Sequence, residues 1–271
     1  ISAAYFASSD VNTNYNALLA RLQGRFMKQF SFDMNYRYGK SLDTSSFESP
    51  CACTNQSFPV DQKEERGRSD FDVRHSYVAS GTWDLPFFRG NSWTDKIAGG
   101  WQISGIATYH TGFPWTPKLF GCLNGNTSTS NGFCDPRPVA LAAGSPGINP
   151  GDNTNENFLR AGGLFGVSGT TIFSSAFNSS NPFQNRPIIG RNTLAGPRYF
   201  SVDMSFAKRF GLGSWGFLGE NANVDVKFNF FNLLNNLNLA PFNSNSDPTR
   251  IQLNTFGVAT SGLSGRVGEF Q

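Results

Sequence analysis

The chain has 271 residues, a net charge of +3 and a mean hydropathy of −0.33. Charged residues make up only 15% of it, against about 25% in typical soluble domains, whereas Gly (29) and Phe (27) are abundant. No segment approaches the roughly 18 consecutive apolar residues of a membrane-spanning helix. No basic run is interleaved with aromatic residues, which argues against nucleic-acid binding. The composition favours an all-β protein with one apolar face.

Apolar and polar side chains alternate with a period of two along much of the chain, which is typical of β-strands. In 30–39, for example, Phe30, Phe32 and Met34 alternate with polar residues, and the apolar face ends in two tyrosines. About eight antiparallel strands are predicted, in chain order at 1–9, 18–26, 30–39, 73–85, 101–110, 200–206, 224–230 and, in a ragged tail, from Ile251 onward.

Two features of these strands favour a transmembrane barrel over a soluble sandwich. Several strands approach the roughly 9–11 residues that cross a bilayer when tilted, and aromatic residues gather at strand ends, where a membrane interface would hold them. The apolar face would then meet lipid and the polar face would line the lumen. The charged residues on the predicted lumen face form either cross-strand ion pairs or a substrate-conducting wall. They are Arg21, Arg25, Asp33, Arg37, Arg74, Asp84, Asp225 and Lys227.

The connections between the predicted strands alternate in length. Outer-membrane barrels have short periplasmic turns and long extracellular loops, so the long connections are predicted to be extracellular and both chain ends periplasmic. A short extra hairpin is expected within 158–173. The short links are 27–29, 86–99 and 211–221, the long loops are 41–70, 112–198 and 233–250, and the link 10–15 falls on the long-loop side by parity.

The four cysteines form two close pairs in Gly-, Asn- and Ser-rich loops: Cys51 with Cys53, and Cys122 with Cys134. No histidine lies near either pair, and the Cys-Ala-Cys spacing is not the usual spacing of a zinc site. Loop disulfides in an oxidising compartment are therefore favoured over a metal or redox site. Their connectivity stays open.

The remaining motifs do not indicate an enzyme. The segment 211–216 matches G-x-G-x-x-G, but another predicted strand follows it instead of the helix that a dinucleotide site needs. His75 and His110 lack a fixed carboxylate partner, and the serine at 264 misses the spacing of a nucleophile elbow. The charged cluster 63–70 is interpreted as a solvated loop base, with contact to ligand or lipopolysaccharide as the alternative. We expect no catalytic residue, cofactor or metal.

Five segments, in order along the chain, together resemble one family. They are 14–22 with 30–41, 72–75 with 83–87, 100–105 with 112–114, 190–197 (Gly-Arg-Asn-Thr-Leu-Ala-Gly-Pro), and 228–235 (Phe-Asn-Phe-Phe-Asn-Leu-Leu-Asn). This pattern resembles TonB-dependent outer-membrane receptors, most closely the Oar-like group with a carboxypeptidase-regulatory-like N-terminal domain. The resemblance implies a 22-stranded barrel with a plugged lumen and energised uptake driven by an inner-membrane TonB complex.

The chain also departs from that family pattern. It contains no plug domain and no TonB-contacting segment, and about eight strands are too few for a barrel of 22. We expect residues 1–271 to be the C-terminal part of a larger barrel in the bacterial outer membrane. The expected partners are membrane lipid, lipopolysaccharide, an unidentified ligand, and TonB through segments outside this chain. The alternatives are a surface barrel or adhesin without transport, and a passive barrel of eight strands.

Overall fold

The computed structural model describes residues 11–46, 62–87, 93–119, 137–140, 155–159, 168–174, 189–211, 223–242 and 247–271. Within these ranges, none of the helices has the length and apolar character that crossing a membrane requires.

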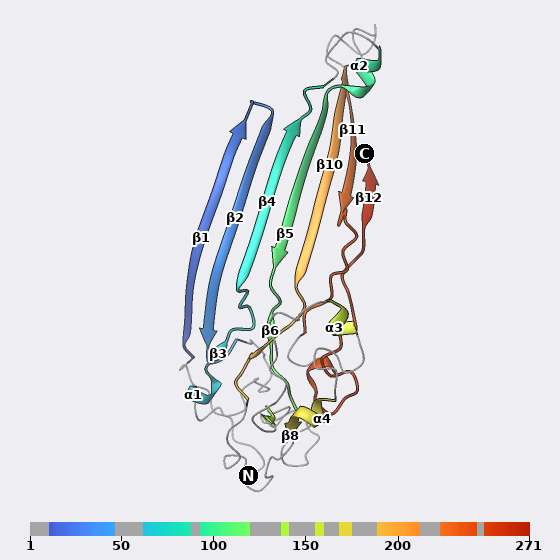
Figure 1. The fold of residues 1–271 in the computed structure, drawn as a ribbon. Coiled ribbons are helices and arrows are strands. Elements are labelled where there is room, and N and C mark those ends of the chain that lie inside the picture. Colours follow the sequence, from blue (N-terminus) through green and yellow to red (C-terminus); the bar gives the residue numbers. More distant parts are fainter. Residues whose placement is uncertain are drawn as a thin grey trace, which may run out of the picture.

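One antiparallel sheet of eight strands dominates the molecule (Figure 1). Its long strands are arranged across the sheet in the same order as along the chain. The order across the sheet is β1, β2, β4, β5, β10, β11, β12, and the short β3 also pairs with β2. Their bounds are β1 Thr13–Phe26, β2 Phe30–Asp43, β3 Gly67–Arg68, β4 His75–Asp84, β5 Trp101–His110, β10 Tyr199–Gly211, β11 Asn223–Phe231 and β12 Val267–Phe270.

The pairing register places apolar residues of one strand opposite apolar residues of the next, and polar residues opposite polar ones. One line of paired residues is apolar across the whole sheet, and we call it the apolar row: Phe26, Phe30, Trp83, Ile103, Phe206, Phe228 and Phe270. The next line, on the other face, is the polar row: Arg25, Ser31, Thr82, Ser104, Ser205, Asn229 and Glu269. Because side chains alternate between the faces of a strand, the sheet has one apolar and one polar face, which confirms the predicted antiparallel strands.

The two ends of the sheet differ in how its strands are connected (Figure 1). At one end, here the short-turn end, residues 27–29 join β1 to β2, and Met27 and Lys28 in this turn have left-handed φ angles of +50° and +57°. The helix α2 (Trp93–Ala98) lies at the same end. The opposite, long-loop end carries the remaining short elements: α1 Gln62–Glu65, β6 Pro114–Trp115, β7 Val139–Ala140, α3 Asn155–Leu159, α4 Gly169–Ile172, β8 Phe173–Ser174, β9 Leu194–Ala195 and the 3-10 turn Asp247–Thr249.

Several predicted boundaries were wrong. β1 starts at Thr13 and not at residue 18, so residues 13–15 of the predicted link 10–15 belong to a strand, and β2 continues to Asp43 into the predicted loop 41–70. The tail is a strand only at Val267–Phe270, because Ile251 and Phe256 turn inward and are buried. The strand predicted at 1–9 lies outside the described residues.

The described parts of 158–173 form short helices and not the expected hairpin. Phe158 lies in the short helix α3, and residues 169–172 form α4. The following Phe173 pairs with Ala140 instead of with a neighbouring segment. Short helices turn Phe158 and Ile172 into a buried cluster, which the local glycine content does not reveal.

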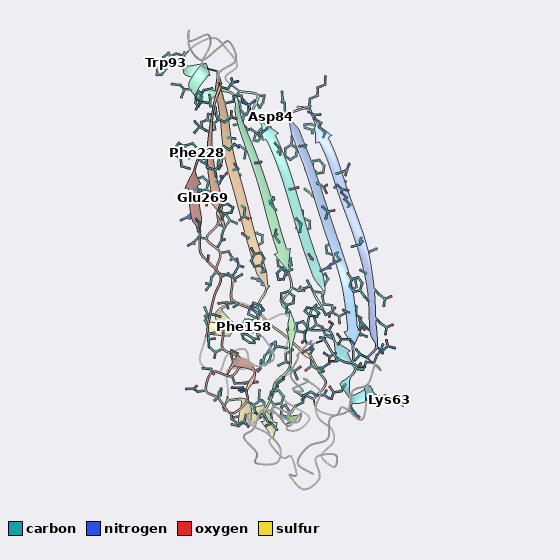
Figure 2. All side chains as sticks on the ribbon, turned by 180° about the vertical axis from the view of Figure 1, so that it is seen from behind. Lys63, Asp84, Trp93, Phe158, Phe228 and Glu269 are labelled. Carbon is teal, nitrogen blue, oxygen red and sulfur yellow. The ribbon has the colours of Figure 1, made fainter. Side chains whose placement is uncertain are left out.

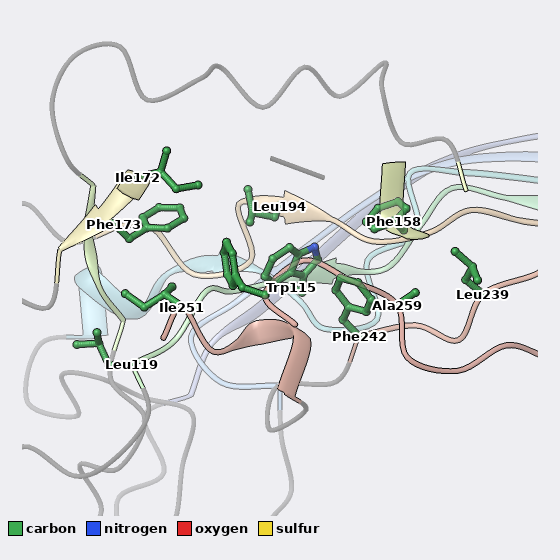
Figure 3. Packing of buried hydrophobic residues seen from close by; sticks show 11 residues of the cluster. Trp115, Leu119, Phe158, Ile172, Phe173, Leu194, Leu239, Phe242, Ile251 and Ala259 are labelled. Carbon is green, nitrogen blue, oxygen red and sulfur yellow. The ribbon is translucent and has the colours of Figure 1, made fainter. Parts of the chain in front are cut away.

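The hydrophobic core lies at the long-loop end and not under the sheet (Figure 3). Segments from different loops meet there and form a packed unit, which we call the loop lobe. Its backbone is tied together by hydrogen bonds such as Lys118 N to Thr249 O (2.7 Å) and Ala259 N to Phe158 O (2.8 Å). The buried cluster consists of Trp115, Leu119, Phe158, Ile172, Phe173, Leu194, Leu239, Phe242, Ile251, Phe256 and Ala259.

At the start of β10, asparagine side chains make backbone hydrogen bonds that a neighbouring strand would otherwise make. Asn238 accepts a hydrogen bond from Phe200 N (2.9 Å) and returns one to Phe200 O (2.9 Å) through its own side-chain amide. Asn232 adopts a left-handed φ of +49° and donates its backbone N–H to Asp203 (2.8 Å). Backbone groups at the long-loop end thereby stay paired where the sheet ladder stops.

A close backbone approach joins the end of β5 to the segment before β10. Gly196 N donates to Phe113 O (2.8 Å), and a Cβ added to Gly112 would lie 1.8 Å from Gly196 O. Only glycine fits at position 112 without moving one of the two chains. This contact fixes the position of the segment after β5 relative to the segment before β10, where the chain passes between the sheet and the loop lobe.

We therefore expect Gly112→Ala to destabilise the protein, by about 1–3 kcal/mol or more, because overpacking against backbone cannot be relieved by a side-chain rotation. The measurement is thermal unfolding of the purified protein in detergent. The control is Gly211→Ala, whose added Cβ would find its nearest atom at 3.6 Å. Equal stability of the two variants would show that the two chains do not approach closely at Gly112.

Candidate functional site

The polar face of the sheet is hollowed, with a cavity volume of about 730 Å³. Residues of the polar row line it, and the row beside it contributes carboxylates at Asp33 and Asp203. Seven of the lining side chains are hydroxyls or amides, and glycines and apolar side chains lie among them, so the hollow offers both hydrogen-bonding groups and apolar contacts. The principal polar lining residues are Gln23, Ser31, Asp33, Ser80, Thr82, Ser104, Asp203, Ser205 and Asn229.

Two ion pairs join charged residues of neighbouring strands on this polar face. Arg21 binds the carboxylate of Asp33, with Nε 3.1 Å from Oδ1, and Asn35 donates to the same carboxylate (2.8 Å). Arg209 and Asp225 stand directly opposite and form a two-pronged pair at 2.7 and 2.9 Å. All of these groups are accessible to solvent, so the two ion pairs contribute little to the stability of the fold. They mainly determine where positive and negative charges lie on this face.

The other residues predicted for the lumen face lie as follows. Arg25 donates to Lys28 O (3.0 Å) at the hairpin turn, and Asp84 accepts from the Gln102 amide (2.8 Å). Arg37 lines a second, smaller hollow, and Lys227 is exposed on β11. Arg74 is different, because it precedes β4 and pairs with Asp72 (Nε to Oδ2 3.0 Å) at the loop base.

On the opposite face, tyrosines form a line near the long-loop end, which we call the aromatic row: Tyr36, Tyr77, Tyr109 and Phe200. His75 extends it, since Tyr36 Oη lies 2.8 Å from His75 Nδ1 and the Tyr38 ring is 5.1 Å away. His110 stacks on Tyr199 at 5.2 Å. Both histidines thus take part in ring packing.

The loop lobe is held by edge-on aromatic contacts around Trp115. Its ring lies 5.2 Å from Phe242 and 5.8 Å from Phe256, in edge-to-face geometry (Figure 3). Phe158 contacts Phe242 at 5.5 Å, and Phe173 contacts Phe256 at 5.9 Å. Such pairs each contribute about 0.5–1.5 kcal/mol beyond their burial. The lobe therefore has a core of its own.

A buried polar network connects the lobe to the base of the first long loop. Arg191 binds the Asp43 carboxylate, and its other donors reach Asp43 O (2.7 Å), Glu65 O (3.0 Å) and Ser46 Oγ (3.1 Å). Asn192 follows with a left-handed φ of +55° and donates to Arg68 O (2.8 Å). This segment belongs to the sequence Gly-Arg-Asn at 190–192.

A second buried arginine joins the same loop from elsewhere in the chain. Arg137 donates to Glu65 Oε1 (2.9 Å), Glu64 O (2.9 Å) and Ile189 O (3.2 Å). Burial lowers the pKa of the Arg137 guanidinium, and the Glu65 carboxylate partly offsets this effect. Both Arg137 and Glu65 are almost fully buried. The network therefore ties the base of the first long loop to residues of the second.

Arg68, Asp72 and Arg74 extend this set at the edge of the lobe. Asp72 is buried and accepts from Arg68 (2.7 Å), from Arg74 (3.0 Å) and from Ser41 N (2.7 Å). These residues come from the cluster 63–70 and its neighbours, which was expected to be a solvated loop base. Much of it is instead structural, since Glu65 and Ser69 are buried.

Across the described ranges, no group of three or more His, Cys, Asp or Glu residues is placed to hold a metal ion. The predicted disulfide residues Cys51, Cys53, Cys122 and Cys134 lie outside those ranges, as does most of the G-x-G-x-x-G segment.

The local sequence pattern did not predict Arg209, the hydroxyl lining or the buried network. Arg209 could have been found by continuing the alternation of β10, because it shares a phase with Asp203 and Ser205. The partners of Arg191 and Arg137 could not, because Asp43 and Glu65 are separated from them by 148 and 72 positions.

Comparison with known proteins gives one match, which covers nearly the whole chain. A family model described as an outer membrane beta barrel domain matches residues 1–269. No curated protein and no solved structure matches the chain.

We predict that Arg191→Met destabilises the loop lobe by about 3–5 kcal/mol, because it leaves the buried carboxylate of Asp43 without its partner. Limited proteolysis should then cut the lobe while the sheet resists. Arg21→Met, which breaks an exposed pair on the wall, is the matched control and should leave the digestion pattern unchanged. A lobe that resists protease equally in both variants would contradict a structural role for the network.

Proposed function

The chain belongs to the outer membrane beta barrel domain family, and from this premise we propose that it forms part of the barrel of a TonB-dependent receptor. The receptor would take up a ligand through the outer membrane with energy supplied by TonB. The observation that carries the proposal is the sheet-wide separation of an apolar face from a hollowed polar face.

Family membership locates the protein in the bacterial outer membrane. In hydrocarbon, every backbone N–H and C=O must be paired within the protein, and the antiparallel ladder achieves this for the inner strands. The apolar face therefore meets lipid. Tyr36 and Phe30 lie in the aromatic and apolar rows, about 20 Å apart along β2 at the rise of a strand. This spacing is comparable with the roughly 25 Å apolar band of such barrels.

The polar wall suits a lumen through which a hydrophilic ligand passes. Two ion pairs cross its strands, Arg21 with Asp33 and Arg209 with Asp225, and hydroxyls and amides line part of the hollow. A ligand could exchange hydrogen bonds with these groups along the wall. The lobe at the long-loop end would be extracellular and would make the first contact with ligand and lipopolysaccharide. The proposal assigns the chain no catalytic step.

The finer assignment to TonB-dependent receptors is supported by the five resembling segments. Two of them meet in the structure, where residues 112–114 approach Gly196. In a third, Asn232 donates its backbone N–H to Asp203 of β10. Resembling segments thus supply contacts at the start of β10 and just before it.

The loop lobe favours a second candidate, a surface barrel or adhesin without transport. The lobe has its own aromatic core and its own buried ion pairs, so it could present a fixed binding surface to another cell or molecule. In that case the polar wall would have no role in conduction.

Two observations distinguish these functions. The gene upstream of codon 1 should encode a plug domain and a TonB-contacting segment, and the purified full-length protein should bind the periplasmic domain of TonB from the same bacterium. A gene that encodes only a signal peptide before residue 1, or a full-length protein that does not bind TonB, would contradict the transport proposal.

The lipid-facing assignment gives a further prediction. Phe32→Arg should impair barrel assembly, because an arginine near the membrane midplane on the lipid face costs about 2–4 kcal/mol. Ser31→Arg, on the neighbouring residue of the polar face, should assemble normally. Assembly is measured as the fraction of protein in the outer membrane that resists urea extraction. Normal insertion of Phe32→Arg, or failure of only Ser31→Arg, would mean that the faces are reversed.

A further inference from the structure

The short helix α2 (Trp93–Ala98) is attached to the lipid-facing side of the sheet at the short-turn end. Trp101 Nε1 donates to Ile97 O (3.1 Å), and Lys208 Nζ donates to Ile97 O (2.7 Å) and also binds Gly99 O. The two donors, Trp101 and Lys208, stand opposite each other on β5 and β10.

Trp101 and Lys208 both belong to the apolar phase of their strands. Lys208 is two residues from Phe206, a member of the apolar row, and Trp101 is two residues from Ile103, another member. Their side chains therefore lie on the face that meets lipid. Since both hold carbonyls at the C-terminal end of α2, that end of the helix lies outside the barrel wall and not over its lumen.

The exposed residues of α2 extend this lipid-facing surface beyond the strand ends. Trp93 and Ile97 are 70% and 52% exposed, and their spacing of four residues places them on the same side of the helix. Figure 2 shows Trp93 at the periphery of this end of the molecule. Tryptophan is enriched at membrane–water interfaces, where its ring meets the acyl chains and its N–H stays near water.

The position of Lys208 otherwise lacks an explanation. A charged group on the lipid face is costly, yet Lys208 is only 4% exposed. Its ammonium lies 5.7 Å from the Trp101 ring centroid and 4.8 Å from that of Phe210. Rings and helix-end carbonyls together supply the interactions that water would otherwise provide. Lys208 is thus committed to holding α2.

We propose that α2 is an interfacial membrane anchor, which lies at the boundary of headgroups and acyl chains in the leaflet at the short-turn end. Trp93 and Ile97 enter the lipid, and Lys208 and Trp101 fix the helix to the barrel wall. The occupant of this surface is lipid, because the surface continues the lipid-facing wall of an outer-membrane barrel. An anchor here would act with or without TonB-dependent transport.

The test uses the full-length protein in vesicles whose phosphatidylcholine carries bromine near the start of the acyl chains. The fluorescence of Trp93 is obtained as the difference between the wild type and Trp93→Phe. It should lose most of its intensity in brominated vesicles compared with unbrominated ones. The matched control is Trp115, which is buried in the loop lobe, and its difference signal should not respond to bromine.

Two lysine variants test how the helix is held. Lys208→Met should reduce the bromine quenching of Trp93, and Lys208→Arg should restore it, because the arginine can still donate to the carbonyls of α2. The control is Lys227→Met. Lys227 lies on the polar face next to Val226, the residue paired with Lys208, so its loss should leave the bromine quenching of Trp93 unchanged. Urea resistance of the membrane-inserted protein shows that each variant is assembled.

Three results would overturn the proposal. Trp93 fluorescence that ignores bromine but is quenched by aqueous acrylamide would place α2 in water. Fluorescence that ignores both quenchers would mean that another protein segment covers the helix. Unchanged bromine quenching in an assembled Lys208→Met variant would remove Lys208 from the attachment.

Discussion

The structure depends on the register of one antiparallel sheet. A period of two along a single strand separates polar from apolar side chains only locally, and a slip of one residue between neighbours would reverse a whole strand. Here the pairings from β1 to β12 carry the apolar row without interruption from Phe26 to Phe270. That continuity turns separate strands into a wall with a lipid side and a water side.

The wall and the loop lobe are stabilised by different physics. The wall needs no buried hydrophobic core, because lipid covers its apolar face and hydrogen bonds between strands satisfy its backbone. The lobe lies beyond the strands and has to form a core as a soluble domain does. Trp115 and its aromatic neighbours provide that core, while Arg191 and Arg137 fix the first long loop against it. The lobe therefore has its own packed core and its own buried ion pairs at the long-loop end of the wall.

How far the sequence predicts this structure follows from the range of the interactions involved. Strands such as 30–38 are visible because alternation is a local pattern. The beginning of β1 is not, because Thr13 and Asn14 place polar side chains on both faces, and this segment becomes a strand by pairing with β2. The network around Arg191 joins residues that are far apart in sequence. Lys208 broke the alternation of β10, and only its contact with α2 explains why a charge stands among apolar residues.

The orientation of β2 tests the central claim most directly. A spin label can be introduced one position at a time from Phe30 to Tyr38 through a keto amino acid, so that the native cysteines remain, and the full-length protein is then reconstituted in bilayers. Accessibility to oxygen, which dissolves in lipid, should peak at even-numbered positions, and accessibility to a water-soluble nickel chelate should peak at odd-numbered ones. Loss of this two-residue alternation, or its reversal, would contradict a wall that separates lipid from water.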